Sequence, residues 1–505
     1  MARTALRPLL TVAIAALALT ITACGSSGGG GTEPDAAPGD LTVSGPIPIE
    51  NLDPHGTSSM DAGTQLAARA IFSQLIRITG PGEYEGELAE DWTANDDASV
   101  WTFTLRDDLT FSDGAAVTAE DVVVSFDRML AAGGPIAGNF TGYTAEAPDE
   151  KTVAFTAPAS DAAFLGKIWS FFVTPQSADE PGFFQDPIGS GPFIVESFEP
   201  GQSLEVVPNP EYGGGAPDLA TLTFQAIPEV SARLTALQTG EVDVTWGMPD
   251  DQIPPLESDT ELTVETVAGT GVITMWMNSS APGLEDAEVR RALWQAVDFA
   301  AIIDALLPIT GTPADAPVSP AVFGYAPQTP YEYDPEAAKA ALDEAGFDYE
   351  NTTIRFQFSQ PQFRQLAQAV TSDLAEIGVK VEPIEKEQAV FLDDLLALNW
   401  ELNIQQVGTQ GYDAATNLGR LYTCAAGRTG YCNPELDEFL AEAGSTSDQD
   451  TREEAYAAAS EIIWNDAVGM YPAFVELPYA WRNSVHGFTP DSSGSPYFDD
   501  VTVSE

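Results

Sequence analysis

The sequence predicts an α/β fold, and two observations lead to this prediction. Short runs that alternate apolar and polar residues, typical of half-buried strands, are separated along most of the chain by stretches with the apolar spacing of helices. Glycine or proline marks the end of several of these stretches. With 505 residues, of which 44% are hydrophobic, the chain can form two or three domains with sizeable cores.

The first predicted elements lie in the first third of the chain. A strand is expected at 41–43 and a short helix at 66–76, and the alternating side chains of 100–105 predict a second strand. Thr118 is followed three residues later by Asp121, a spacing typical of a capping box, and predicts the start of a helix.

Strand and helix patterns continue through the middle of the chain. A strand is expected at 193–198, followed by a helix at 230–238 that ends at a glycine. Another strand at 272–277 precedes a helix whose apolar residues begin at Val289, and we expect this helix to run to Pro308.

Three further helices are expected in the last third. Asp334, followed by proline, marks the start of one. A second is predicted at 363–377, before a strand at 379–381, and the last long helix is predicted at 451–464.

The chain is strongly acidic, with 77 acidic residues, 20 basic residues and a formal net charge of −57. Affinity for nucleic acid depends on Lys and Arg that neutralise phosphates, so we expect no nucleic-acid partner. The charge also gives no attraction to anionic lipid. Solubility is the simplest explanation of the charge, and adaptation to a saline habitat is the alternative.

The N-terminus has the build of an export signal. Arg3 and Arg7 precede an apolar stretch, 9–21, that is too short to span a bilayer. The last residues of that stretch, Ile-Thr-Ala, stand directly before Cys24 and resemble with it the lipobox of bacterial lipoproteins.

In lipoproteins a peptidase cuts before this cysteine, which then receives lipid. The resemblance therefore implies a signal peptide over 1–23, a lipidated Cys24, and a flexible linker within 24–40. The protein would be anchored outside the cytoplasmic membrane by lipid only. A plain signal peptide with a chance cysteine is the alternative.

Two cysteines remain, Cys424 and Cys432. An even pair in an exported protein predicts a disulfide. The alternative is a metal site, but the chain has two histidines, His55 and His486, and neither is near the pair in sequence. We expect no metal site and no cofactor.

Five blocks of sequence together resemble one family. The strongest begins WTFTLRDDLTFSDG, and the five blocks cover 101–126, 189–212, 237–243, 289–298 and 333–338. In this order and spacing they are similar to the family 5 extracellular solute-binding proteins of ABC importers, which include dipeptide-, oligopeptide- and nickel-binding proteins. The blocks identify the fold and not the ligand.

The resemblance implies a two-lobed clamp of the periplasmic-binding-protein type. Lobe I would comprise 41–55, 188–270 and 478–505, with an extra subdomain over 56–187, and lobe II would comprise 271–477. A monomer would capture a small solute between the lobes as a hinge closes, and would deliver it to the permease subunits of an ABC transporter.

The resemblance also implies how a peptide would be held. Peptide-binding members hold the α-ammonium with an Asp in a loop that matches Asp413, with Tyr412 and Gln410 beside it. Two alanines replace the usual Asp-Pro-Asp continuation, and an ordinary surface-turn Asp is the alternative. Arg364 and Arg420 are candidates for a ligand carboxylate, with an ordinary surface role as the alternative.

Four more residues are candidates for ligand contact. Trp276 and Asn278 follow the expected hinge, and Trp400 is an aromatic candidate for the cleft wall, although core packing is the commoner role of Trp. His55 lies in a loop that often reaches the cleft in this family.

We expect a binding protein and not an enzyme, because the chain has two histidines, no recognisable catalytic triad and no His-Glu-x-x-His motif. Capture of peptides or peptide-like solutes is the main hypothesis. The alternatives are oligosaccharides, another solute such as a nickel chelate, haem or a glutathione-like compound, and a ligand-sensing receptor without transport.

Overall fold

The computed structural model describes residues 38–504. The predicted signal peptide and the lipidation predicted at Cys24 lie outside these residues. No helix of the described part combines the length and the apolar character needed to cross a membrane.

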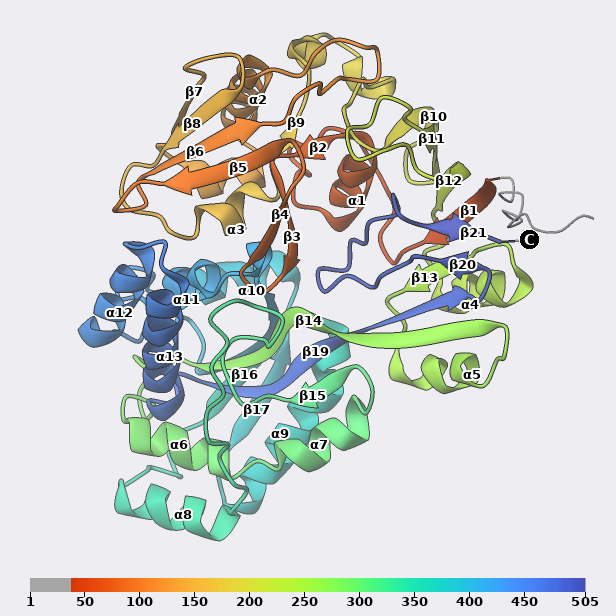
Figure 1. The fold of residues 1–505 in the computed structure, drawn as a ribbon. Coiled ribbons are helices and arrows are strands. Elements are labelled where there is room, and N and C mark those ends of the chain that lie inside the picture. Colours follow the sequence, from red (N-terminus) through yellow and green to blue (C-terminus); the bar gives the residue numbers. More distant parts are fainter. Residues whose placement is uncertain (1–37, 505) are drawn as a thin grey trace, which may run out of the picture. The chain divides into compact units, whose positions relative to one another are not determined.

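One sheet of 11 strands runs through the described chain, in the order β10-β11-β12-β1-β13-β19-β14-β18-β16-β17, with β15 paired to β19 (Figure 1). Its strands are β1 (Gly39–Ser44), β10 (Phe193–Glu199), β11 (Ser203–Pro208), β12 (Leu219–Gln225), β13 (Val244–Trp246), β14 (Leu262–Met277), β15 (Gly311–Pro313), β16 (Ile354–Phe358), β17 (Val381–Glu385), β18 (Leu402–Gly408) and β19 (Gly469–Arg482). The predicted strands at 41–43, 193–198 and 272–277 are confirmed.

β14 and β19 join the two halves of this sheet. They are 16 and 14 residues long and pair antiparallel. One end of β19 pairs with β13, and the opposite end of β14 pairs with β18. The register between them shifts between Ala268 and Val272, so the ladder is irregular halfway along. The two crossings between the predicted lobes, at 270–271 and 477–478, lie in these two strands.

Apolar side chains form separate cores on the two sides of this junction. One core gathers residues between Val272 and Phe474. A second combines β1, β10–β13 and the C-terminal segment, and a third fills the region between Leu75 and Val173. The molecule is thus a two-lobed α/β protein with an extra subdomain, as the sequence predicted. The exact limits of lobe I, its subdomain and lobe II stay a prediction.

The subdomain contains a four-stranded sheet in the order β5-β6-β8-β7, made of β5 (Ala89–Ala94), β6 (Val100–Leu105), β7 (Thr144–Glu146) and β8 (Thr152–Thr156). Helix α2 (Ala119–Ala132) starts as predicted, because the backbone N–H of Thr118 donates to Asp121 Oδ2 at 2.9 Å. A cap of this kind stabilises a helix by about 1 kcal/mol. α2 ends at Gly133, whose φ is 65°.

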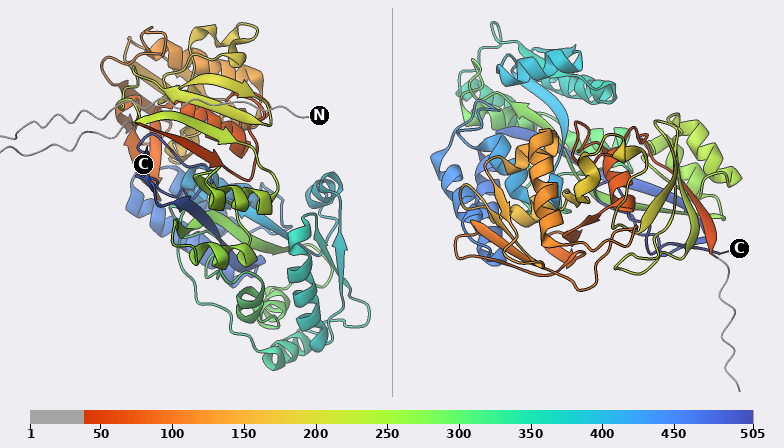
Figure 2. Two further views of the ribbon diagram at one scale, coloured as in Figure 1. Left: turned by 90° about the vertical axis from the view of Figure 1, so that its right-hand side faces the viewer. Right: turned by 90° about the horizontal axis from the view of Figure 1, so that it is seen from above.

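Three two-stranded ladders complete the strands: β2 (Ser73–Gln74) with β9 (Phe172–Val173), β3 (Ile76–Gly80) with β4 (Glu83–Gly86), and β20 (Val485–His486) with β21 (Thr502–Val503). The other helices are α1 (Ala62–Ile71), α3 (Phe164–Ile168), α4 (Val230–Thr239), α5 (Ile253–Glu257), α6 (Ala287–Gln295), α7 (Phe299–Leu306), α8 (Pro335–Glu344), α9 (Arg364–Glu376), α10 (Gln388–Leu396), α11 (Ala414–Tyr422), α12 (Pro434–Gly444) and α13 (Gln449–Asn465). Figure 2 shows them from two further directions.

Two helix predictions were wrong in part. The helix expected at 66–76 is α1, which ends at Ile71 because Ser73 and Gln74 pair with β9, far along the chain at Phe172 and Val173. The single helix expected to reach Pro308 is two helices. Asp298 ends the first by capping the second, since its carboxylate accepts from the N–H of Ala301.

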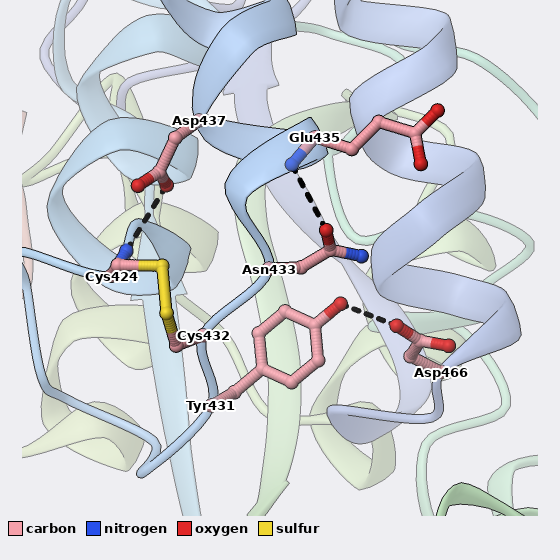
Figure 3. The surroundings of a disulfide bond; sticks show 7 residues. All are labelled: Cys424, Tyr431, Cys432, Asn433, Glu435, Asp437 and Asp466. Carbon is pink, nitrogen blue, oxygen red and sulfur yellow. Dashed lines mark hydrogen bonds between the residues drawn. A yellow bond between two sulfur atoms is a disulfide. The ribbon is translucent and has the colours of Figure 1, made fainter.

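The predicted disulfide is present between Cys424 and Cys432 (Figure 3). The N–H of Cys424 donates to Asp437 Oδ1 at 3.0 Å, which ties the loop to helix α12. Tyr431, inside the loop, donates its hydroxyl hydrogen to Asp466. The bond therefore fixes a loop on lobe II.

Candidate functional site: a cavity between the lobes

A cavity of about 240 Å³ lies where both lobes meet the two long strands. Lobe I and its subdomain contribute the start of α1, Trp169 and the C-terminal loop, and lobe II contributes the end of β18 and the loop after it. β14 and β19 contribute the floor, through Gly269 to Gly271 and through Val475 and Leu477. The volume lies below the roughly 300–1,000 Å³ of drug-sized sites, so it suits a small solute.

The floor of the cavity is held by backbone hydrogen bonds from three segments. The N–H of Thr409, after β18, donates to the carbonyl of Thr270 at 3.1 Å. The N–H of Thr270 donates to the carbonyl of Ser492 at 3.1 Å. The cavity floor therefore joins lobe II, the irregular part of β14 and the C-terminal loop of lobe I.

Gln65 offers an unused acceptor at the cavity. Its side chain, on α1, is 3% exposed, and its Nε2 donates to the carbonyl of Ser59. A carbonyl can only accept, so this contact requires the amide nitrogen to face Ser59 and leaves Oε1 as the free end. Among the residues that the structure describes, Oε1 has no hydrogen-bond partner although it is buried. The atom is shielded from solvent in this conformation, so a ligand would reach it only after rotation of the Gln65 side chain.

Asp491 organises the C-terminal wall of the cavity. Its Oδ1 accepts from the backbone N–H of Ser493 at 2.8 Å and of Ser495 at 3.2 Å. Its Oδ2 accepts from the hydroxyl of Tyr412 at 3.2 Å, a hydrogen bond from lobe II to lobe I. Burial, followed by the charge of Asp491, raises the pKa of Tyr412 well above its usual value, so this phenol stays protonated and donates.

The charge of Asp491 is balanced by Arg69. The Arg69 guanidinium lies 3.8 Å from the Asp491 carboxylate and stacks between the rings of Trp169 and Tyr497, at 5.2 and 4.4 Å from their centroids. Trp169 lines the cavity in turn. The pair builds the wall and presents no free charge to the cavity.

Asp413, the predicted partner of a peptide ammonium, is bound inside lobe II. Its side chain is 0% exposed. Oδ2 accepts from Arg452 at 2.6 Å, and Oδ1 accepts from the Tyr456 hydroxyl at 3.0 Å and from the N–H of Ala415 at 3.0 Å, which caps α11. Burial alone would lower the pKa of Arg452, but the charge of Asp413 raises it. In this conformation Asp413 does not line the cavity, and its contact with a ligand stays a prediction.

Three predicted cleft residues lie in the core of lobe II and not at the cavity. Trp276 donates through Nε1 to the Tyr422 hydroxyl at 3.1 Å. Asn278 donates through Nδ2 to the carbonyl of Trp400 at 2.9 Å. All three side chains are at most 2% exposed. β14 explains the placement, because its lobe II end runs away from the cavity floor and into the core.

The two predicted arginines differ in their relation to the cavity. Arg364 is exposed and pairs with Glu385 at 2.7 Å. Arg420 donates to Asn417 Oδ1 at 3.0 Å, and Asn417 donates to the Thr409 hydroxyl at 2.7 Å. Burial lowers the pKa of Arg420. Arg420 thus reaches the lining residue Thr409 through one side chain.

His55 is buried in the first lobe. Its Nε2 lies 2.9 Å from the carbonyl of Phe172 and its Nδ1 lies 2.9 Å from Arg128 Nη1. Burial, followed by the charge of Arg128, lowers its pKa to about 4, so the ring is neutral at pH 7. Nδ1 then accepts from Arg128 and Nε2–H donates to Phe172. His55 does not line the cavity.

Of the predicted site residues, Tyr412 is the one whose described side chain lines the cavity. Gln410 opens the short helix η6 (Gln410–Tyr412), and its side chain lies outside what the structure describes. Sequence reasoning missed Gln65, Trp169 and the C-terminal loop. The run Asp-Ser-Ser-Gly-Ser at 491–495 was the available signal, because small polar residues in that density are typical of a functional loop.

Within residues 38–504, no group of three or more His, Cys, Asp or Glu side chains is arranged to hold a metal ion. The cavity instead offers amides, hydroxyls, backbone groups and an aromatic face. This donor set can form hydrogen bonds with a polar ligand.

The two lobes touch beside the cavity through two glycines. Gly411 has a φ of 74°, and a Cβ built on it would lie 1.4 Å from the carbonyl oxygen of Gly166 in α3. Gln449, at the start of α13, donates to the carbonyl of Gly82 at 2.8 Å, in the turn between β3 and β4. The lobes are therefore in contact, as in a closed clamp.

The chain is similar to bacterial transport proteins. Residues 83–429 match the family model described as "Bacterial extracellular solute-binding proteins, family 5 Middle". The chain is 29% identical over 493 residues to the Escherichia coli (strain K12) protein named "Probable D,D-dipeptide-binding periplasmic protein DdpA", covering 93% of this chain and 95% of that protein. It is 27% identical over 444 residues to "Heme-binding protein A" of Haemophilus influenzae, covering 79% of this chain and 81% of that protein.

The fold is also found in solved structures. The structure of HbpA2 from Haemophilus parasuis matches with a TM-score of 0.84 at 26% identity, and the match covers 92% of this chain and 100% of that one. The similarity extends over both lobes and the subdomain.

Proposed function

This chain belongs to the bacterial extracellular solute-binding proteins of family 5, and from that premise we propose that it captures peptides or peptide-like solutes for an ABC importer. The family resemblance of the five sequence blocks is thereby confirmed. The solute would be held between the lobes and delivered to the permease subunits in the membrane.

The observation that carries the proposal is the composition of the cavity wall. Lobe I, the subdomain, both long strands and lobe II all contribute to it. A ligand in this cavity contacts both lobes at once and favours the closed state by its differential affinity for that state. Binding and closure are therefore one event, which is what a carrier needs in order to signal loading.

The names of the relatives support a peptide but do not decide the ligand. One relative is named for D,D-dipeptides and another, at similar identity, for heme. Identity of 27–29% leaves the few side chains at the cavity free to differ. Peptides remain the main proposal, with oligosaccharides and chelates as the other arms of the test.

The site of action is outside the cytoplasmic membrane, as for the family. We propose in addition that the chain is anchored there by lipid on Cys24 and acts as a monomer. Metabolic labelling with a fatty acid should mark the protein, and Cys24→Ser should abolish the label. Persistence of the label in this variant would contradict the anchor.

Ligand-dependent stability tests the function. The purified protein is screened by thermal unfolding against di- to pentapeptides, oligosaccharides and metal chelates. A ligand that binds only the folded state stabilises it by about 2.7 kcal/mol at a hundredfold excess over Kd. A rise in melting temperature with peptides supports the proposal. A rise with sugars or chelates alone would support a carrier role but contradict a peptide ligand.

The variant Trp169→Leu tests whether the ligand-dependent rise in melting temperature comes from binding in the cavity. Trp169 lines it, whereas Trp92, in the same subdomain, packs on Phe103 at 6.4 Å and does not. The ligand shift should be lost in Trp169→Leu and kept in Trp92→Leu. No substrate should be consumed in either case, because we propose a carrier and not an enzyme.

A further inference from the structure

The cavity wall carries no formal charge at neutral pH. Its side chains, among the described residues, are amides, hydroxyls, aliphatic groups, an indole and a phenol. Resting on the proposed function and deepening it, we propose that the solute buries only uncharged polar groups here, as a peptide with a blocked or cyclised amino end does. A free α-ammonium is excluded.

Two carboxylates that adjoin lining residues, those of Asp413 and Asp491, already have partners within the protein. Asp413 is fully buried and bound to Arg452, Tyr456 and Ala415. Asp491 faces Arg69 and accepts hydrogen bonds from Tyr412 and from the loop that follows it. To serve a ligand ammonium, either carboxylate would have to leave a buried arginine without its counter-charge.

The desolvation of an ammonium is therefore uncompensated in this cavity. A buried charge is tolerated only where it is paired and hydrogen-bonded. Neutral amide and hydroxyl groups lose far less on leaving water and find their partners here. The electrostatic balance of the site favours a neutral guest over a charged one of the same shape.

The wall also contains a specific partner for such a guest. Gln65 Oε1 is a buried acceptor without a donor among the described residues. If the side chain rotates toward the cavity, Oε1 accepts from an amide N–H or a sugar O–H without adding charge. Trp169 supplies an apolar face beside it, and Gln406 supplies an amide from lobe II. The site thus selects for a ligand that donates hydrogen bonds and is neutral.

Two matched pairs of probes test the inference separately from the function. The first pair is alanyl-phenylalanine and N-acetyl-alanyl-phenylalanine amide. The second is glucosamine and N-acetylglucosamine, which differ in the same way without a peptide. Titration calorimetry of the purified protein at pH 7 gives the two affinity ratios.

We expect the blocked dipeptide to bind about tenfold or more tightly than the free one, the factor that corresponds to one unsatisfied buried group. Equal or tighter binding of the free dipeptide overturns the inference and leaves the peptide function standing. If N-acetylglucosamine binds more tightly than glucosamine and neither dipeptide binds, the inference of a neutral site is supported and the proposal of a peptide ligand is rejected. Binding of none of the four contradicts both.

A variant that adds a charge should reverse the preference. Gln406→Glu places a carboxylate on the cavity wall at an exposed side chain, so the fold should survive it. The ratio should move toward the free dipeptide by about fivefold or more. The control is Gln362→Glu, on the exposed surface of the same lobe. A ratio unchanged in Gln406→Glu, with its melting temperature maintained, counts against a charge-free cavity as the source of selectivity.

Discussion

Polar groups inside a lobe and polar groups between the lobes have different partners. Asp413 and His55 lie within single lobes, fully buried and fully hydrogen-bonded. Between the lobes, Tyr412 reaches Asp491 by one hydrogen bond, and Gly411 meets Gly166 through backbone. The first kind holds a lobe together, and in the proposed clamp the second kind would form and break as the lobes close and open. Variants of the first kind should change unfolding, and variants of the second kind should change closure.

The largest effect is expected from Arg452→Met. It leaves the Asp413 carboxylate buried without its cation, which costs about 3–5 kcal/mol of unfolding free energy. Urea unfolding measures it. Adding Asp413→Asn should restore part of the loss, because the uncompensated charge is then gone. Failure of the double variant to recover any stability would mean that packing, and not charge, is what Arg452 provides.

A pH dependence from His55 comes next. Its pKa is lowered from 6.5 to about 4 in the folded state, so the unfolded chain binds the proton between these values. The contribution of the neutral His55 ring to the free energy of unfolding is present above pH 6.5. It is lost as the pH falls toward 4, which lowers the free energy of unfolding by up to about 3 kcal/mol. Urea unfolding of the protein and of His55→Gln across this range should show the difference.

The control for His55 is His486, which is exposed on β20. A change of slope in His55→Gln that His486→Gln does not reproduce would assign the pH dependence to the buried ring. Equal slopes for the unchanged protein and for His55→Gln would refute the buried neutral ring.

Gly411→Ala should act mainly on closure. The added methyl would meet the carbonyl of Gly166, and the backbone there has a positive φ, which costs an alanine roughly 1–2 kcal/mol. Small-angle scattering should show a larger radius of gyration and calorimetry a weaker ligand affinity. Gly419→Ala, in α11 with nothing within 4 Å of the new Cβ, is the matched control. A compact, fully active Gly411→Ala protein would mean that these glycines do not govern the lobe contact.

The smallest effect is expected from Tyr412→Phe. It removes the hydrogen bond to Asp491 between the lobes, worth about 0.5–1.5 kcal/mol of closure. Ligand affinity should fall by about two- to tenfold, with unfolding nearly unchanged. Tyr333→Phe, at an exposed tyrosine, should change neither. If the variant lowers the free energy of unfolding as much as the free energy of binding, Tyr412 stabilises the fold and does not act mainly on the contact between the lobes.

The sequence predicts the fold better than the site, for a physical reason. Strand alternation, the cap at Thr118 and the proline after Asp334 act on neighbouring residues, and the structure confirms them. Where pairing partners are distant, prediction failed, as at 73–74, which leave the helix to pair with β9.

The cavity depends wholly on distant segments. Gln65, Trp169, Thr270, Thr409 and Ser493 belong to five separate stretches of chain. No local pattern marks them, and Trp276, which has an equally suggestive position in sequence, lies in the core. The family motif predicted the correct loop, since Tyr412 lines the cavity. It did not predict that Asp413 forms an ion pair with Arg452 inside lobe II.

The irregular step in β14 between Ala268 and Val272 has a mechanical consequence. A ladder bends most easily where its register breaks, and Gly269 and Gly271, which form the cavity floor, lie at that point. A bound ligand would thus lie at the point where the sheet bends most easily. A small backbone shift at this point would produce a larger displacement at the outer end of each lobe. The positions of these outer ends would therefore differ between the ligand-bound and ligand-free protein, with no chain of side-chain contacts leading from the ligand to them.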